Sequence, residues 1–220
     1  MTSASPLPVW VARPLQDPAE AGVVTSPAGI DAEWLPLGQP WQTGEPGPAF
    51  RAGWARVRWH ETALHYDAVF MGGGARNAAR QLNERTWELG DVGEIFVQAG
   101  AGSGYLEVHV TPENARLQLH WSADGLERVR GKVAALGEFM IAQPDWVQSR
   151  THQGKNFWAI HVAIPAARFA LNRLRAGQLL RTAVCRYDYR TPEPVLSSTA
   201  PLPVPFFHHR ARWHSLLLSS

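Results

Sequence analysis

The side chains best placed to recognise a polar ligand lie between residues 85 and 110. Glu94 and Glu107 each fall in a short segment with the alternating pattern of a strand. Two carboxylates on neighbouring strands can in principle act as a hydrolytic pair. More often such carboxylates bind a polar ligand, bind a cation or face solvent. We therefore expect binding, not catalysis, at these positions.

Tryptophan is over-represented, with ten residues in the chain. A tryptophan ring has a broad apolar face and one polar donor, so it can stack on the C–H face of a sugar ring. Trp87 lies in the polar stretch NERTWELGD and fits either this role or that of a lid over the core. Trp59, Trp121 and Trp158 alternate with aliphatic residues, so we expect them in the core.

Other reactive groups have simpler explanations. Cys185 lies within a strand pattern and is expected to be a buried structural thiol. His208 and His209 are adjacent and would point to opposite faces of a strand, so they do not predict a metal pair. A histidine cluster assembled from distant strands remains open. The run of glycines 72–74 lacks the remainder of a phosphate-loop pattern and is expected to be a connection.

The elements that must position these residues are mainly strands. Period-two alternation or a short apolar run predicts strands at 54–60, 63–70, 93–98, 105–110, 115–121, 157–165, 181–189 and 213–219, with a shorter one at 9–11. The first two form a hairpin, and 131–152 is ambiguous, with room for two more strands. Short helices are expected at 77–87 and 166–174. The fold class is therefore all-β, an antiparallel β-sandwich of about nine to eleven strands with one or two short helices.

Length and composition fit one domain over residues 1–220, with residues 1–28 as an N-terminal extension packed on the core. Twenty-one basic and nineteen acidic residues argue against a nucleic-acid partner. No apolar run approaches the roughly 20 residues that span a bilayer. The N-terminus shows no signal-peptide pattern. We expect a cytoplasmic protein, or an extracytoplasmic one if a leader has been removed.

Six segments in order resemble the family 9 carbohydrate-binding modules and the wider DOMON-like group of sandwiches. The most specific is TWELGDVGEIFV, with Trp87, Asp91 and the strand Glu94-Ile95-Phe96. The others are GIDAEW at 29–34, the hairpin 55–70, GYLEVHVTPEN at 104–114, LRTAVCRYD at 180–188 and PFFHHRARWHSLLL at 205–218. Together they span about residues 29–218.

The resemblance implies a non-catalytic module that binds a sugar or oligosaccharide between two aromatic rings. By motif position Trp87 matches one ring, Phe207 the second and Glu94 the hydrogen-bonding glutamate. Glu107 falls where the family has an arginine. Glu107 and Arg186 are expected to add polar contacts. No cofactor is expected, although some family members bind calcium, for which no residues can be mapped here.

Two alternatives remain open at this stage. The departures at Glu107, Ala183 and Phe207 also fit a structural or protein-interaction sandwich that has lost its sugar. Related sandwiches bind haem, which would require Met71 with a histidine. The sequence does not identify the sugar or the oligomeric state.

Overall fold

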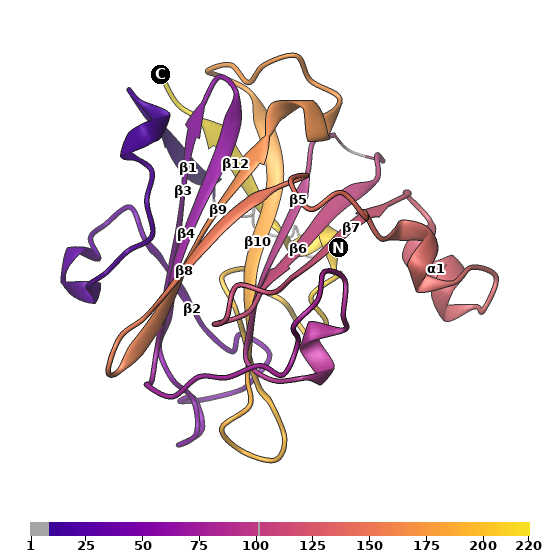
Figure 1. Ribbon diagram of the computed structural model, residues 1–220. Helices are drawn as coiled ribbons and strands as arrows, with labels where there is room; N and C mark the ends of the chain where they lie inside the picture. Colours follow the sequence, from indigo (N-terminus) through magenta and orange to yellow (C-terminus); the bar gives the residue numbers. More distant parts are fainter. Residues whose placement is uncertain (1–8, 101) are drawn as a thin grey trace, which may run out of the picture.

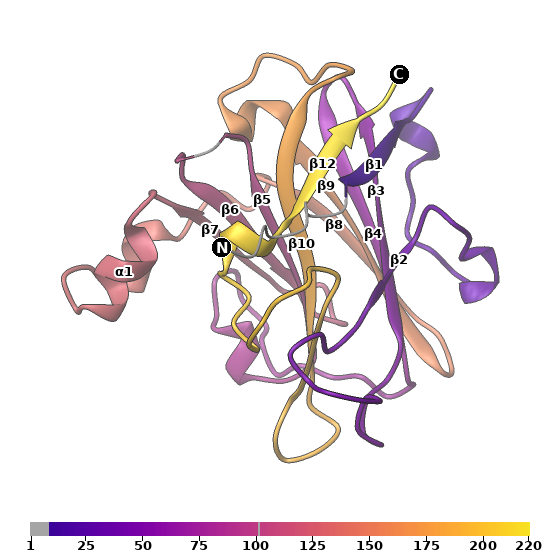
Figure 2. The same cartoon turned by 180° about the vertical axis from the view of Figure 1, so that it is seen from behind.

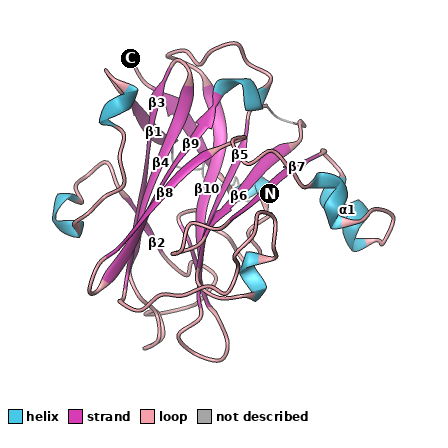
Figure 3. Cartoon of the chain, in the orientation of Figure 1, coloured by secondary structure: helices cyan, strands magenta, loops and turns pink. Residues whose placement is uncertain are grey.

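The computed structural model describes residues 9–100 and 102–220, and strands account for most of its regular structure (Figures 1 and 3). Twelve strands form one curled sheet, which confirms the all-β sandwich. The strands of the first half of the chain are β1 (Val9–Pro14), β2 (Leu35–Leu37), β3 (Gly53–His60), β4 (Ala63–Met71), β5 (Val92–Gln98) and β6 (Tyr105–Val110). Those of the second half are β7 (Arg116–Trp121), β8 (Gln148–Gln153), β9 (Phe157–Pro165), β10 (Leu179–Asp188), β11 (Val195–Ser198) and β12 (His214–Leu218).

The strand order is β7-β6-β5-β10-β12-β1-β3-β4-β9-β8, with β11 paired to β10 and β2 to β3. The expected hairpin is present as β3–β4, and most neighbours are antiparallel. Strand β1 differs, because it pairs in parallel with both β12 and β3. It joins the two layers, which Figure 2 shows from behind. Part of the expected N-terminal extension is thus a strand of the sheet, and residues 1–8 lie outside the described residues.

The main core lies between the two layers. Period-two alternation places one face of each strand there, including Ile95 and Val97 from β5 and Tyr66 and Phe70 from β4. Trp59 and Trp158 belong to this core, as expected. A second apolar cluster covers the outer face of β5, β6, β7 and β10 and includes Trp121. Cys185 is buried and free within that second cluster.

The predicted helices are wrong in position. Residues 77–87 are mostly irregular and end in the 3-10 turn η3 (Thr86–Glu88), and 166–174 contains only the turn η5 (Ala166–Phe169). The one α-helix among residues 9–100 and 102–220, α1 (Gly125–Arg130), follows β7. The ambiguous region contains the turn η4 (Leu136–Phe139) and one strand, β8. Figure 1 shows α1 at the side of the sheet beyond β7. No helix among the described residues is long and apolar enough to cross a membrane.

Candidate functional site

A cavity of about 330 Å³ opens on the outer face of the layer formed by β5, β6, β7 and β10. Its floor is made by side chains of these strands. Its walls come from three connections outside the sheet: the turn 85–87, the α1–η4 segment and the loop 205–208. Loops on a rigid sheet are a common setting for a binding site. The cavity lies outside the main core.

Strand alternation brings Glu94, Glu107 and His109 to the floor of this cavity. In β5 the neighbours Ile95 and Val97 point into the main core, so Glu94 points outward. In the β5–β6 pairing, Glu94 is directly opposite His109. Glu107 precedes His109 by two residues and therefore shares its face. The two carboxyl groups and the imidazole are consequently close neighbours on adjacent strands.

Both oxygens of the Glu107 carboxylate have close partners in the protein. His109 Nε2 lies 2.7 Å from Oε1, and the indole N–H of Trp121 donates to Oε2 at 2.6 Å. His208 Nδ1 lies 3.8 Å from Oε2 and is also 2.8 Å from the Tyr105 hydroxyl. Burial alone would raise the pKa of Glu107, but His208, His109 and the Trp121 hydrogen bond hold it below its usual value. Glu107 is therefore an ionised, fixed group of the cavity.

Glu94 is buried but lacks such donors. Among the described residues no hydrogen bond reaches its carboxyl group, and its nearest charged neighbour is His109, with Nε2 3.4 Å from Oε1. Only 3% of the residue is exposed. Burial, together with the charge of Glu107, raises the pKa of Glu94 to about 8 despite the opposing effect of His109. The Glu94 carboxyl group therefore has bonding capacity left for a ligand.

His109 is held in place from its other side. Its Nδ1 lies 2.8 Å from the Thr86 hydroxyl, and Trp87 makes an edge contact with the ring at a centroid distance of 5.7 Å. Burial would lower the pKa of His109, but the two adjacent carboxylates raise it. The turn η3 thus places Trp87 at the cavity wall and, through Thr86, holds His109 on the floor.

Aromatic rings form much of the cavity wall. Trp87 is half-buried, whereas Phe207 is buried and contacts Phe96 and Tyr187 through edge-on ring pairs. Trp121, at the floor, stacks on Phe139 with a centroid distance of 4.9 Å. Of the two rings predicted from the sequence, Trp87 is therefore the one that a ligand can reach more easily.

The structure brings four of the five predicted ligand-binding residues to this cavity: Trp87, Glu94, Glu107 and Phe207. It does not bring Arg186 there. In the β5–β10 pairing Cys185 is opposite Glu94, so Arg186 points to the other face. Arg186 is buried between the layers, where it pairs with Asp188 at 2.8 Å and donates to the backbone oxygen of Met71 at 3.2 Å.

Sequence reasoning did not assign to the site four further residues that line the cavity: His109, Trp121, Tyr187 and His208. The alternation of 105–110 already placed His109 beside Glu107, so His109 could have been found. Trp121 looked like a core residue because it alternates with leucines, and it is buried. Its indole N–H nevertheless serves Glu107, a contact between strands that no sequence pattern shows.

One group of potential metal ligands occurs among the described residues, namely Glu94, Glu107 and His109. Calcium prefers six to eight oxygen ligands. This set offers two carboxylates and a nitrogen, so it does not have the composition of a calcium site. Met71, considered for haem, packs with Trp34, Val69 and Phe157 on the outer face of the other layer and does not line the cavity.

Comparison with known proteins shows similarity at the level of structure. No protein-family model matches the sequence, and no curated protein matches it. A candidate carbohydrate-binding protein from Bacteroides uniformis ATCC 8492 has 16% sequence identity and a TM-score of 0.69, over 95% of this chain and 98% of that one.

Two solved structures of a family 9 carbohydrate-binding module from Caldicellulosiruptor kristjanssonii are also similar. The complex with cellotriose has a TM-score of 0.57 at 11% identity, over 96% of this chain and 93% of that one. The complex with glucose has a TM-score of 0.56 at 11% identity, over 90% and 93%. Because both similarities extend over nearly the whole of each chain, this protein has the fold of the family 9 carbohydrate-binding modules.

Proposed function

We propose that this protein binds a carbohydrate in the cavity on the outer face of β5, β6, β7 and β10, without catalysing a reaction. The observation that carries the proposal is the combination, in one cavity, of a half-buried tryptophan and a buried glutamate that has no hydrogen bond to any described residue. The fold adds support, since structurally similar modules are in complex with cellotriose and glucose.

The chemistry of a sugar ring matches these walls. Its C–H face would stack on Trp87, which removes apolar surface from water. Its hydroxyl groups would bond to Glu94, which accepts hydrogen bonds when ionised and also donates one when protonated. Glu107 is already bonded to His109 and Trp121, so its main role would be to hold the floor in place. Affinities in the micromolar to millimolar range, about 4 to 8 kcal/mol, are expected for such an open site.

A ligand screen with a matched pair of variants tests this proposal. Wild-type protein, Trp87→Ala and Trp54→Ala are compared by thermal shift and calorimetry against mono- and oligosaccharides, with and without calcium. Trp54 is a half-buried tryptophan on β3 that does not line the cavity. We expect one class of sugar to stabilise the wild type and Trp54→Ala, but not Trp87→Ala.

The opposite results are equally informative. An unchanged Kd in Trp87→Ala would contradict this site. A screen without any sugar ligand would contradict the function and favour a structural or protein-interaction role for the sandwich. Light scattering would then be the next measurement, because that role predicts a stable dimer or another assembly.

A further inference from the structure

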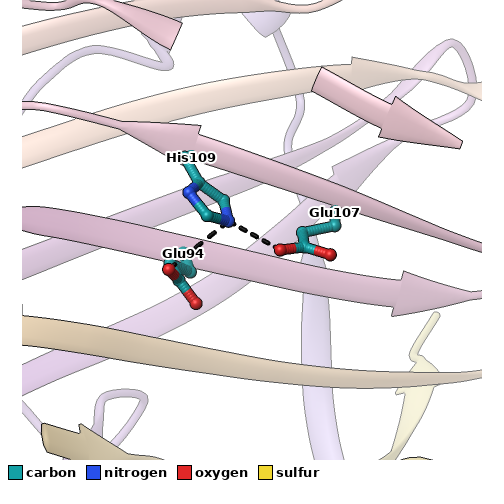
Figure 4. Close-up of side chains that lie close together, drawn as sticks. All are labelled: Glu94, Glu107 and His109. Carbon is teal, nitrogen blue, oxygen red and sulfur yellow. Dashed lines mark hydrogen bonds and ion pairs between the residues drawn. The ribbon is translucent and has the colours of Figure 1, made fainter. Parts of the chain in front are cut away.

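Three ligating atoms converge at the floor of the cavity. Oε1 of Glu94 lies 3.4 Å from Nε2 of His109, and Oε1 of Glu107 lies 2.7 Å from the same nitrogen. One potential ligand atom from each residue lies within 4.8 Å of the other two. Figure 4 shows both carboxyl groups directed at one edge of the imidazole ring.

Two buried carboxyl groups share one imidazole in this cluster. Glu94 and Glu107 are 3% and 4% exposed, and one imidazole lies between them. His208 is close only to Glu107, and burial lowers the pKa of its imidazole. Buried carboxylates are normally paired or coordinate a metal. Among the described residues Glu94 has no hydrogen bond, and its charged neighbour His109 is shared with Glu107, which lies closer to it.

We propose that Glu94, Glu107 and His109 bind one divalent transition-metal ion of the zinc type, with its remaining coordination position facing the cavity. Two carboxylates and a neutral imidazole balance a charge of +2. The mixture of oxygen and nitrogen ligands favours zinc or a similar first-row metal over calcium and magnesium. The metal site shares Glu94 with the proposed sugar site, but metal binding does not require a sugar.

The distances suit tetrahedral coordination. Zinc lies about 2.0 to 2.2 Å from nitrogen and carboxylate oxygen, so two of its ligands are separated by about 3.3 to 3.5 Å. The separation between Glu94 Oε1 and His109 Nε2 already has this value, at 3.4 Å. Glu107 Oε1 is at hydrogen-bond distance from the same nitrogen, so its carboxylate must turn away by several tenths of an ångström when the ion enters.

Neighbouring side chains hold the proposed ligands in place through hydrogen bonds, as outer-shell residues do in known metal sites. Thr86 bonds to Nδ1 of His109, so the ring keeps its proton on Nδ1 when the ion displaces the proton on Nε2 that faces Glu107, and Nε2 then binds the ion. Trp121 fixes Glu107 through Oε2, which leaves Oε1 directed at the cluster. Three protein ligands with a fourth position open to a cavity are the usual arrangement of a non-structural zinc site.

Metal binding is tested directly on the full chain. After treatment with a chelator, the protein is titrated with Zn²⁺ and, separately, with Co²⁺, whose visible absorption reports the coordination geometry. We expect one ion per chain and a tetrahedral Co²⁺ spectrum. Glu94→Gln and Glu107→Gln should each weaken zinc binding by at least about 100-fold, above the effect of losing an outer-shell partner.

Glu88→Gln is the matched control, because Glu88 lies beside the cavity but is exposed and pairs with Arg85. It should bind zinc as the wild type does. Thermal unfolding in the presence of chelator shows that each variant is folded, and Zn²⁺ should then raise the Tm of the wild type and Glu88→Gln only.

Three results would overturn the proposal: no zinc binding by the wild type, equal zinc binding by both cluster variants, or tight binding of Ca²⁺ alone. The sugar screen in the presence of chelator is a separate readout. If the protein binds sugar but no metal, the proposed function stands and the metal site is refuted. If it binds metal but no sugar, the metal site stands and the proposed function is refuted.

Discussion

His65 is a single residue whose burial makes folding sensitive to pH. It lies on the outer face of β4, 4% exposed, and neither ring nitrogen has a hydrogen-bond partner among the described residues. Its ring stacks on His161 at a centroid distance of 5.5 Å. Burial, followed by the neighbouring His161, lowers the pKa of His65 to about 4, although Asp67 opposes the shift. His65 is therefore neutral in the folded protein at neutral pH.

The free energy of unfolding should consequently decrease as the pH falls from about 6.5 to 4. In that range the unfolded chain binds a proton at His65 that the folded chain does not, which lowers stability by up to about 3 kcal/mol. His65→Phe should reduce this pH dependence, as measured by urea unfolding at pH 7, 6, 5 and 4.5. Asp67, whose pKa is lowered, adds a loss only in more acidic solution, below its unfolded value.

His209→Gln serves as the control for this prediction, because His209 lies on the loop before the turn Arg210–Arg212, away from β4. Its pH profile should follow that of the wild type. If His65→Phe has a profile parallel to the wild type, the pH sensitivity of the protein does not come from His65.

Strand β1 shows how one short element joins the layers. It pairs in register with β12 from Val9 opposite Ser215 to Ala12 opposite Leu218, and its end pairs with β3. Alternation buries Trp10 to 3% exposure and leaves Val11 48% exposed. Trp10→Ala should lower the free energy of unfolding by about 3 to 5 kcal/mol, because it opens a cavity in the main core.

Val11→Ala changes the other face of the same strand and should cost less than about 0.5 kcal/mol. Urea unfolding of both variants, with unchanged m-values, measures the difference. Similar small costs for the two substitutions would mean that β1 does not contribute to the core.

The sequence predicts elements well where one face of a strand is apolar, and less well where side chains bond to the local backbone. The alternation of 54–60 and 105–110 predicts β3 and β6 because one side of each faces the core. Residues 77–87 have helical composition, but Asn77 bonds to the backbone oxygens of Thr86 and Asp91. Glu84 accepts from the backbone N–H groups of residues 80 and 81. Such bonds compete with a helix.

The candidate site was predictable to the same extent. Motif position identifies Trp87, Glu94 and Phe207, and alternation adds Glu107. The orientation of Arg186 depends on the register between β5 and β10, which pairs Cys185 with Glu94. Because the sequence does not reveal this register, it does not show which face of β10 meets the cavity.

At the scale of the whole molecule, the two faces of the layer β5–β6–β7–β10 have different roles. Its inner face packs against the other layer, and its outer face carries the cavity. The inner packing is close: a Cβ atom at Gly93 would lie 2.9 Å from the ring of Phe70. Phe70 is fully buried and packs on Trp158 with a centroid distance of 4.5 Å. Removing a large ring from the inner face should therefore cost more stability than removing a half-buried ring from the cavity wall.

Phe70→Ala and Trp87→Ala test this separation. Phe70→Ala removes a large ring from the tightly packed inner face and should cost about 3 to 5 kcal/mol of unfolding free energy. Trp87→Ala removes a half-buried ring beside a cavity that is already open, so it should cost less than about 1 kcal/mol. Urea unfolding gives both values. Large and similar costs would show that the rings over the outer face, Trp87 among them, hold the sheet together, and the cavity would then be a by-product of packing.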